Sequence, residues 1–110
     1  MGTVLVLRTD QMGEGDPELG TKILGTCLRK LASFGDLEAI VLYNSGVHLV
    51  TRGSPVAAEL VLLEERGVDI LPCGTCVEHY GLQDHLLFER VSSMDEILAT
   101  LAGADKVITL

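Results

Sequence analysis

The sequence has no tryptophan, only two tyrosines and two phenylalanines, and few basic residues. It therefore lacks the stacking side chains on which single-stranded nucleic acids and sugars usually bind. Eight Lys and Arg against sixteen Asp and Glu give a formal net charge of −8, which disfavours nucleic acids and anionic membrane surfaces. No apolar run approaches the roughly 20 residues that span a bilayer. We expect no nucleic-acid partner and no membrane partner.

Cysteine is also scarce, and its number is odd. Three cysteines do not make the disulfide framework of a secreted domain, so they favour a reducing compartment. No targeting signal is recognisable, and we expect a cytoplasmic protein. A length of 110 residues with 47% hydrophobic content fits one compact domain over residues 1–110, which can bury a core without disulfide or metal staples.

Strand and helix patterns alternate along the chain. Short apolar runs predict strands at residues 3–7, 37–43, 68–72 and 106–109. Capping residues and helical periodicity predict three helices, which begin at Asp16-Pro17, Ser54-Pro55 and Ser93 and end at Gly35, Gly67 and near Gly103. We expect a brief extended segment at residues 47–50 and a short helical turn at residues 77–81. This alternation indicates an α/β fold with a parallel sheet covered on both faces.

The motif Cys73-Gly74-Thr75-Cys76 directly follows the strand predicted at residues 68–72. Reactive groups in α/β proteins are commonly placed at this end of a strand. A thiol near a helix start meets unpaired N–H groups, which favour the thiolate and lower the thiol pKa. One cysteine could then attack a persulfide or disulfide while the other resolves or stabilises the intermediate. The alternative is that both cysteines fill a tight turn.

The other predicted strands end at the same edge of the sheet as this motif. Residues 9–15, 44–46 and 72–76 are therefore expected to line one composite pocket. Within it we expect Thr9, Asn44 and Gly74 to hold a substrate anion, largely through backbone N–H groups, with Gly46 and Thr75 also in the binding site. The sequence contains no phosphate-binding glycine pattern, and no cofactor is expected.

A metal site is a second interpretation of the same region. Cys73, Cys76, His79 and His85 supply four sulfur or nitrogen ligands within a short span, as tetrahedral zinc requires. Zinc ribbons and fingers usually bring their ligand pairs from separated elements, so we predict no metal site. His48 has no evident partner and is expected to be structural or exposed.

Three segments, in this order, resemble the DsrE-like domain of YedF-type proteins: residues 13–20 (GEGDPELG), 43–47 (YNSGV) and 71–76 (LPCGTC). Residues 92–94 are also similar to the Ser-Asn-Met segment of that family, and the resemblance covers nearly the whole chain. It implies a three-layer α/β/α sandwich around a mostly parallel five-stranded sheet. It also implies frequent oligomers, so a homo-oligomer is expected.

The resemblance further implies sulfur relay, in which a cysteine persulfide passes sulfane sulfur between partners, and for YedF-type proteins a link to selenium metabolism. On that basis Cys73 would be the acceptor and Cys76 the auxiliary thiol. TusD and DsrE subunits carry their accepting cysteine near the start of the preceding helix, where this sequence has Ser54-Pro55, so that assignment does not transfer. YedF-type proteins usually carry a TusA-like domain, which these residues lack, so a separate TusA-like donor or acceptor is expected.

A competing hypothesis comes from a different functional class. The chain could be a non-catalytic, oligomeric binding or assembly module whose acidic surface docks a basic partner. In that case the cysteines would be packed in the core or bind metal.

Overall fold

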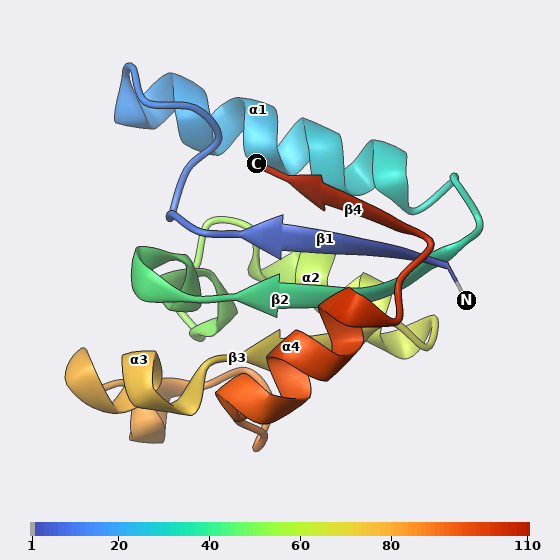
Figure 1. Ribbon diagram of the computed structural model, residues 1–110. Coiled ribbons are helices and arrows are strands. Elements are labelled where there is room, and N and C mark those ends of the chain that lie inside the picture. The colour runs from blue at the N-terminus through green and yellow to red at the C-terminus, as the bar shows by residue number, and fades with distance from the viewer. Residues whose placement is uncertain (1) are drawn as a thin grey trace.

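Residues 2–110 are described by a computed structural model in which strands and helices alternate (Figure 1). The strands are β1 (Thr3–Leu7), β2 (Leu37–Leu42), β3 (Asp69–Pro72) and β4 (Lys106–Thr109). The α-helices are α1 (Pro17–Leu31), α2 (Ala57–Glu65), α3 (Gly74–His79) and α4 (Met94–Ala102). Two short 3-10 helices are η1 (Asn44–Val50) and η2 (Gln83–His85). No helix within residues 2–110 is long and apolar enough to cross a membrane.

The strands form one parallel sheet in the order β3-β2-β1-β4. The α/β class and the parallel sheet are confirmed, but the expectation of five strands is wrong, because the described residues form four. The chain after α3 returns to the edge beside β3 at one bridge only, between Cys73 and Ser92. There the Ser92 N–H donates to the Pro72 carbonyl at 2.7 Å. Beyond Ser92 the pairing ends, because Ser93 already caps α4.

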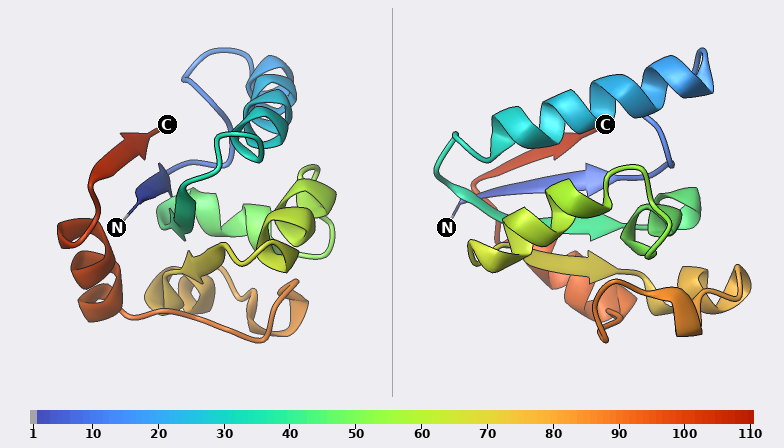
Figure 2. Two further views of the ribbon diagram at one scale, coloured as in Figure 1. Left: turned by 90° about the vertical axis from the view of Figure 1, so that its right-hand side faces the viewer. Right: turned by 180° about the vertical axis from the view of Figure 1, so that it is seen from behind.

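Helices cover both faces of the sheet, which gives three layers. The left panel of Figure 2 shows α1 and α2 on one face and α4 on the other. Under α1 and α2, the larger core cluster includes Leu5, Ile40 and Leu60, each fully buried. Under α4, a smaller cluster joins Val6, Val41 and other strand residues to Ile97. The α4 face is therefore the more thinly covered of the two.

Two of the three predicted helix starts follow the capping signals in the sequence. Asp16 caps α1, since its carboxylate accepts the Leu19 N–H at 2.8 Å, and Pro17 occupies the first helical position. The hydroxyl of Ser93 accepts the Glu96 N–H at 3.1 Å and caps α4. These two predicted caps are confirmed. The cap predicted at Ser54 is wrong, because α2 begins at Ala57 and its N-cap residue is Val56, which makes no side-chain cap. The Ser54 hydroxyl instead accepts the Val56 N–H at 3.1 Å, in the turn before the helix.

The expected extended segment at residues 47–50 is wrong, because these residues belong to the 3-10 helix η1. Asn44 adopts a left-handed conformation with φ 52°, and the Gly46 N–H donates to the Tyr43 carbonyl at 3.1 Å. The chain therefore turns as soon as β2 ends. The alternating apolar residues Val47 and Leu49 suggested a strand, but a tight helical turn buries both of them equally well.

Candidate functional site

The carboxyl ends of β1, β2 and β3 lie at one edge of the sheet, on the left in Figure 1. The loop after β1, the helix η1 and the helix α3 follow these ends directly. Gly46 lets η1 pack against β1, because a Cβ atom at this position would overlap the Leu7 carbonyl oxygen. The edge therefore brings together segments that are distant in sequence.

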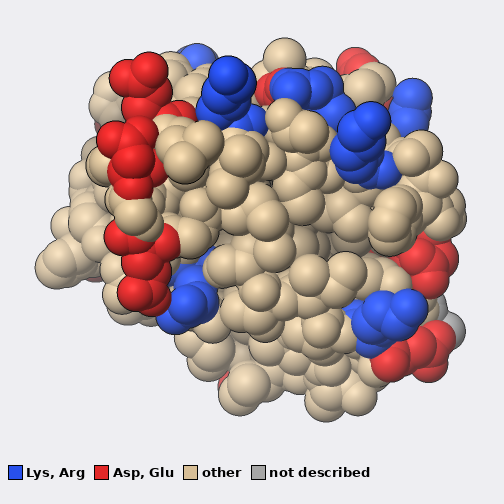
Figure 3. Space-filling view, turned by 90° about the horizontal axis from the view of Figure 1, so that it is seen from above, with Lys and Arg blue, Asp and Glu red and all other residues tan. Residues whose placement is uncertain are grey.

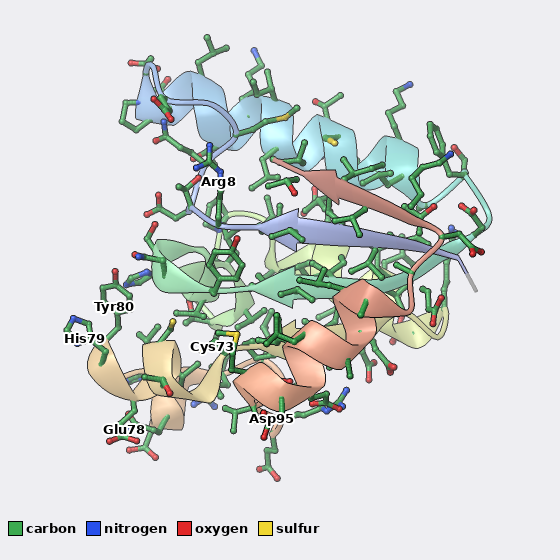
Figure 4. All side chains as sticks on the ribbon, in the orientation of Figure 1. Arg8, Cys73, Glu78, His79, Tyr80 and Asp95 are labelled. Atoms are coloured by element: carbon green, nitrogen blue, oxygen red, sulfur yellow. The ribbon has the colours of Figure 1, made fainter. Side chains whose placement is uncertain are left out.

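Cys73 lies at the junction of β3 and α3, where its N–H donates to the Leu42 carbonyl at 2.8 Å. Its side chain is only 4% exposed and belongs to the core cluster beneath α4, together with Leu71 and Ile97. Figure 4 shows it at the start of α3, close to α4. The thiol that the resemblance implies as sulfur acceptor is thus an interior side chain in this structure.

Cys76 lies one helical turn further on and is only partly buried. Its sulfur accepts a hydrogen bond from the Asn44 N–H at 3.1 Å. Burial raises the pKa of the Cys76 thiol above the ordinary value of 9.0, the Asn44 N–H lowers it, and the hydrogen-bonded thiol of Cys73 raises it further.

The expectation of a lowered thiol pKa is therefore wrong for Cys76. Burial of the thiolate raises the pKa by more than the hydrogen bond from one N–H group lowers it. The helix that carries this cysteine has only six residues and adds few aligned peptide dipoles. Cys76 is thus a protonated thiol at neutral pH, and the backbone supplies one donor to any charge that develops on its sulfur.

A side-chain network holds Asn44 in place. The hydroxyl of Tyr80 donates to the Asn44 Oδ1 at 3.1 Å. The ring of Tyr80 lies against those of His48 and His79, with centroid distances of 4.4 and 5.1 Å. His48 Nδ1 lies 3.0 Å from the Ser45 carbonyl oxygen. His48 therefore has partners that the sequence did not reveal.

Sequence reasoning missed Tyr80. A signal for it was available, because Tyr80 lies four residues after Cys76 and is one of only two tyrosines in the chain. Residues four apart in a helix share a face, so this spacing places the phenol beside the thiol. Figure 4 shows Tyr80 and His79 at the outer end of α3, beyond Cys73.

Two hollows meet at Cys76 and Asn44. The smaller has a volume of about 240 Å³ and is otherwise lined by Thr75, His79 and Tyr80. The larger has a volume of about 400 Å³, and its remaining lining residues are the apolar or aromatic side chains of Tyr43, Met94, Ile97, Leu98 and Leu101. Cys76 thus lies between a polar hollow and an apolar one.

The other predicted binding residues lie outside these two hollows. The Thr9 hydroxyl donates to the Gln11 carbonyl at 2.7 Å, within its own loop. The Gly74 N–H donates to the Ser92 carbonyl at 2.8 Å, so it already has a partner. Gly46 is buried against β1. Of the five residues, Asn44 and Thr75 are the ones that border the hollows beside Cys76.

The four candidate zinc ligands do not converge. Within residues 2–110 there is no group of three or more His, Cys, Asp or Glu side chains placed to hold a metal ion. His85 belongs to the separate helix η2, and the ring of His79 packs against Tyr80.

Acidic side chains gather near this edge of the sheet. Figure 3 shows them together at the end of the molecule where the loop after β1 meets the start of α1. Four exposed carboxylates lie in this stretch, namely Asp10, Glu14, Asp16 and Glu18. Arg8 lies 3.8 Å from Glu14, a pair whose side chains are both more than half exposed. Such a pair adds little stability, and the region keeps a negative charge.

Solved structures with the same fold come from three organisms. The ychN protein from E. coli aligns over 100% of both chains, with a TM-score of 0.71 and 18% identity. A protein of unknown function from Methanobacterium thermoautotrophicum aligns over 98% of this chain and 97% of its own, with a TM-score of 0.70 and 22% identity. A conserved protein of unknown function from Bacteroides thetaiotaomicron aligns over 99% and 95%, with a TM-score of 0.66 and 20% identity.

These structural similarities establish the fold. A search among curated proteins gives no match. The sequence model of the DsrE/DsrF-like family matches residues 19–110, which include the whole Cys-Gly-Thr-Cys motif. The chain therefore belongs to the DsrE/DsrF-like family.

Proposed function

We propose that this protein is a sulfur carrier that accepts sulfane sulfur on Cys76 as a persulfide and passes it to an acceptor thiol. The observation that carries the proposal is the position of Cys76. Its sulfur accepts a hydrogen bond from the Asn44 N–H, and the residue lines two hollows. Cys73, in contrast, is buried, with 4% of its surface exposed. Membership of a family commonly linked to sulfur relay supports it. The accepting role thus moves from Cys73 to Cys76.

The step balances without any further reagent. The Cys76 thiolate attacks the outer sulfur of a donor R–S–SH, the donor's S–S bond breaks, and R–S⁻ leaves and takes up a proton. Cys76 then carries S–SH. Attack on that terminal sulfur by an acceptor thiolate reverses the process and returns Cys76 to the thiol. The Asn44 N–H stabilises the negative charge on the Cys76 sulfur in both directions.

Cys73 is the auxiliary thiol in this proposal. It is hydrogen-bonded to Cys76. Attack by Cys73 on the inner sulfur of the persulfide would form a Cys73–Cys76 disulfide and release HS⁻, so the burial of Cys73 in the core protects the cargo. Both thiols are free in the structure, and a reducing cytoplasm would keep them so. The resemblance to YedF-type domains supports selenium as another cargo.

The test is the intact mass of the protein after incubation with a persulfide donor, with and without reductant, followed by peptide mapping. We expect a reducible gain of one sulfur on the wild type, on Cys73→Ser and on the matched control Cys27→Ser. Cys76→Ser should gain none. Loading that survives in Cys76→Ser but is lost in Cys73→Ser would return the accepting role to Cys73. No loading on any folded variant would remove the carrier function.

The acidic edge supports a partner with a basic surface. The four exposed carboxylates belong to the loop after β1 and the start of α1, at the edge of the sheet that also carries α3 (Figure 1). Opposite charges steer two proteins together and raise the association rate. A TusA-like protein as donor or acceptor, and a homo-oligomeric carrier, belong to this proposal. The test of this partner is cross-linking of the loaded protein to a TusA-like protein. We expect 0.5 M salt to weaken the cross-linking, because it shortens the screening length to about 4 Å.

A further inference from the structure

We infer that the apolar hollow beside α4 binds the organic group R of the donor R–S–SH, which leaves with the inner sulfur, and that this group is uncharged and apolar. The inference rests on the proposed carrier function of Cys76 and names its substrate class. It follows from the shape, the lining and the charge of the surface around this thiol.

The hollow is placed to receive a leaving group. Cys76 is one of its lining residues, and four side chains of α4 line it as well. A donor whose outer sulfur meets Cys76 must extend its remaining atoms away from that sulfur, because the S–S bond lies in line with the attacking thiolate. The volume of about 400 Å³ lies within the range of small-molecule sites, roughly 300 to 1,000 Å³.

The lining selects against charge. Besides Cys76 and the Asn44 amide, it consists of one tyrosine and four aliphatic or thioether side chains, with no Lys, Arg, Asp or Glu. The neighbouring hollow of about 240 Å³ also lacks Lys and Arg. Because the chain has a net charge of −8, an anionic donor is repelled on approach and finds no cation at the thiol.

The same lining favours apolar groups. Met94 is 50% exposed and Leu98 is 58% exposed on the outer wall, although both are large and apolar. An apolar substituent that covers them removes their surface from water and gains roughly 25 cal/mol for each Å² buried. Ile97 forms the floor of the hollow, since it is 1% exposed.

Thiosulfonates of the form R–SO₂–S–CH₃ test this selectivity directly, because R belongs to their leaving group. The Cys76 thiolate attacks the methylthio sulfur, the S–S bond breaks, the sulfinate R–SO₂⁻ leaves, and CH₃–S remains on Cys76 as a mixed disulfide. The measurement is the rate of modification of Cys76 by the benzyl, methyl and anionic sulfonatoethyl reagents, mapped by peptide mass. Each rate is divided by the rate with free N-acetylcysteine, which cancels the intrinsic reactivity.

We expect the normalised benzyl rate to exceed the methyl rate about tenfold, because burial of one ring gains about 1.4 kcal/mol or more. The sulfonatoethyl rate should fall below the methyl rate. Leu98→Gln should cut the benzyl preference about threefold. Leu62→Gln is the matched control, because Leu62 is a 44% exposed leucine on α2, which covers the other face of the sheet. If Leu98→Gln unfolds, Met94→Gln replaces it.

Equal normalised rates for the benzyl and methyl reagents would overturn the inference, and so would an unchanged preference in a folded Leu98→Gln protein. Light scattering provides another decisive result. If the wild type lacks the preference and is an oligomer that Leu98→Gln dissociates, a second copy of the chain fills the hollow instead.

Failure of this inference and failure of the carrier function are distinguishable. Sulfur loading of Cys76 without any benzyl preference leaves the carrier and removes the substrate class. A benzyl preference without sulfur loading keeps the apolar selectivity of the hollow and removes the carrier function. Free organic persulfides and persulfidated protein cysteines can both supply an apolar group. Faster loading from benzyl persulfide identifies the first source, and faster loading from a peptide with phenylalanine beside the persulfidated cysteine identifies the second.

Discussion

Replacing Asn44 by alanine and by glycine separates two contributions that this residue makes. Its backbone is left-handed, with φ 52°, and its side chain accepts the Tyr80 hydroxyl at 3.1 Å. Both substitutions remove the side-chain hydrogen bond. Only alanine must then bear the steric cost of the left-handed backbone, since glycine has no Cβ atom.

The magnitudes follow from these two contributions. Loss of the hydrogen bond to Tyr80 costs both variants about 0.5 to 1 kcal/mol in the free energy of unfolding. The left-handed conformation costs alanine about 1 to 2 kcal/mol, and the greater chain entropy of unfolded glycine offsets about 0.4 to 1 kcal/mol of the difference. The alanine variant should therefore be less stable than the glycine variant by about 1 kcal/mol. For a chain of this length that equals about 4 °C in Tm.

Urea unfolding gives the stability difference, and alkylation of Cys76 as a function of pH gives the consequence for the site. The glycine variant keeps the backbone that aims the residue 44 N–H at the Cys76 sulfur, so its pH profile should match that of the wild type. An alanine variant that relaxes to negative φ turns this N–H away. Because that N–H lowers the thiol pKa, the profile should move to higher pH. Equal stabilities of the two variants would refute the reasoning.

Three further changes test other parts of the structure. Gly46→Ala should destabilise by about 3 kcal/mol in urea unfolding, because its Cβ atom overlaps the Leu7 carbonyl oxygen; a loss below about 1 kcal/mol contradicts this packing. Alkylation of Cys76 should still accelerate at pH 9, because the pKa lies above 9.0 and the thiolate fraction keeps rising, whereas a plateau below pH 8 contradicts a raised pKa. Ser93→Ala should cost about 1 kcal/mol by the same method, since it removes the cap that holds the Glu96 N–H, and an unchanged stability shows that the cap is replaced by water.

Local signals in the sequence were sufficient for most of the fold. Apolar runs located all four strands, and the caps at Asp16 and Ser93 located two helix starts, because these features depend on neighbouring residues alone. The number of strands came from the family resemblance instead. It was wrong because pairing beside β3 depends on where the chain returns after α3, and Ser92 makes one bridge there.

The site was less predictable, because it depends on contacts across 30 residues or more. Convergence of η1 with α3 followed from the parallel topology, and Asn44 and Thr75 lie where that argument placed them. The bond between Asn44 and Tyr80 joins residues 36 positions apart, and no local pattern encodes it. The raised pKa of Cys76 likewise reflects burial by several elements, which the position of the residue in its helix does not report.

The direction of the Cys73 side chain, however, could be predicted from the alternation of side chains along β3. Side chains of a strand point to opposite faces in turn, so Cys73 shares a face with Leu71. Leu71 belongs to the core cluster beneath α4, and the first thiol is therefore directed into that core. The change to helical geometry at Gly74 breaks the alternation, and the next turn carries Cys76 out of the sheet and against Asn44. In this chain the motif therefore buries its first thiol and leaves its second partly exposed beside Asn44, which is the physical reason for proposing Cys76 as the residue that carries the exchangeable sulfur.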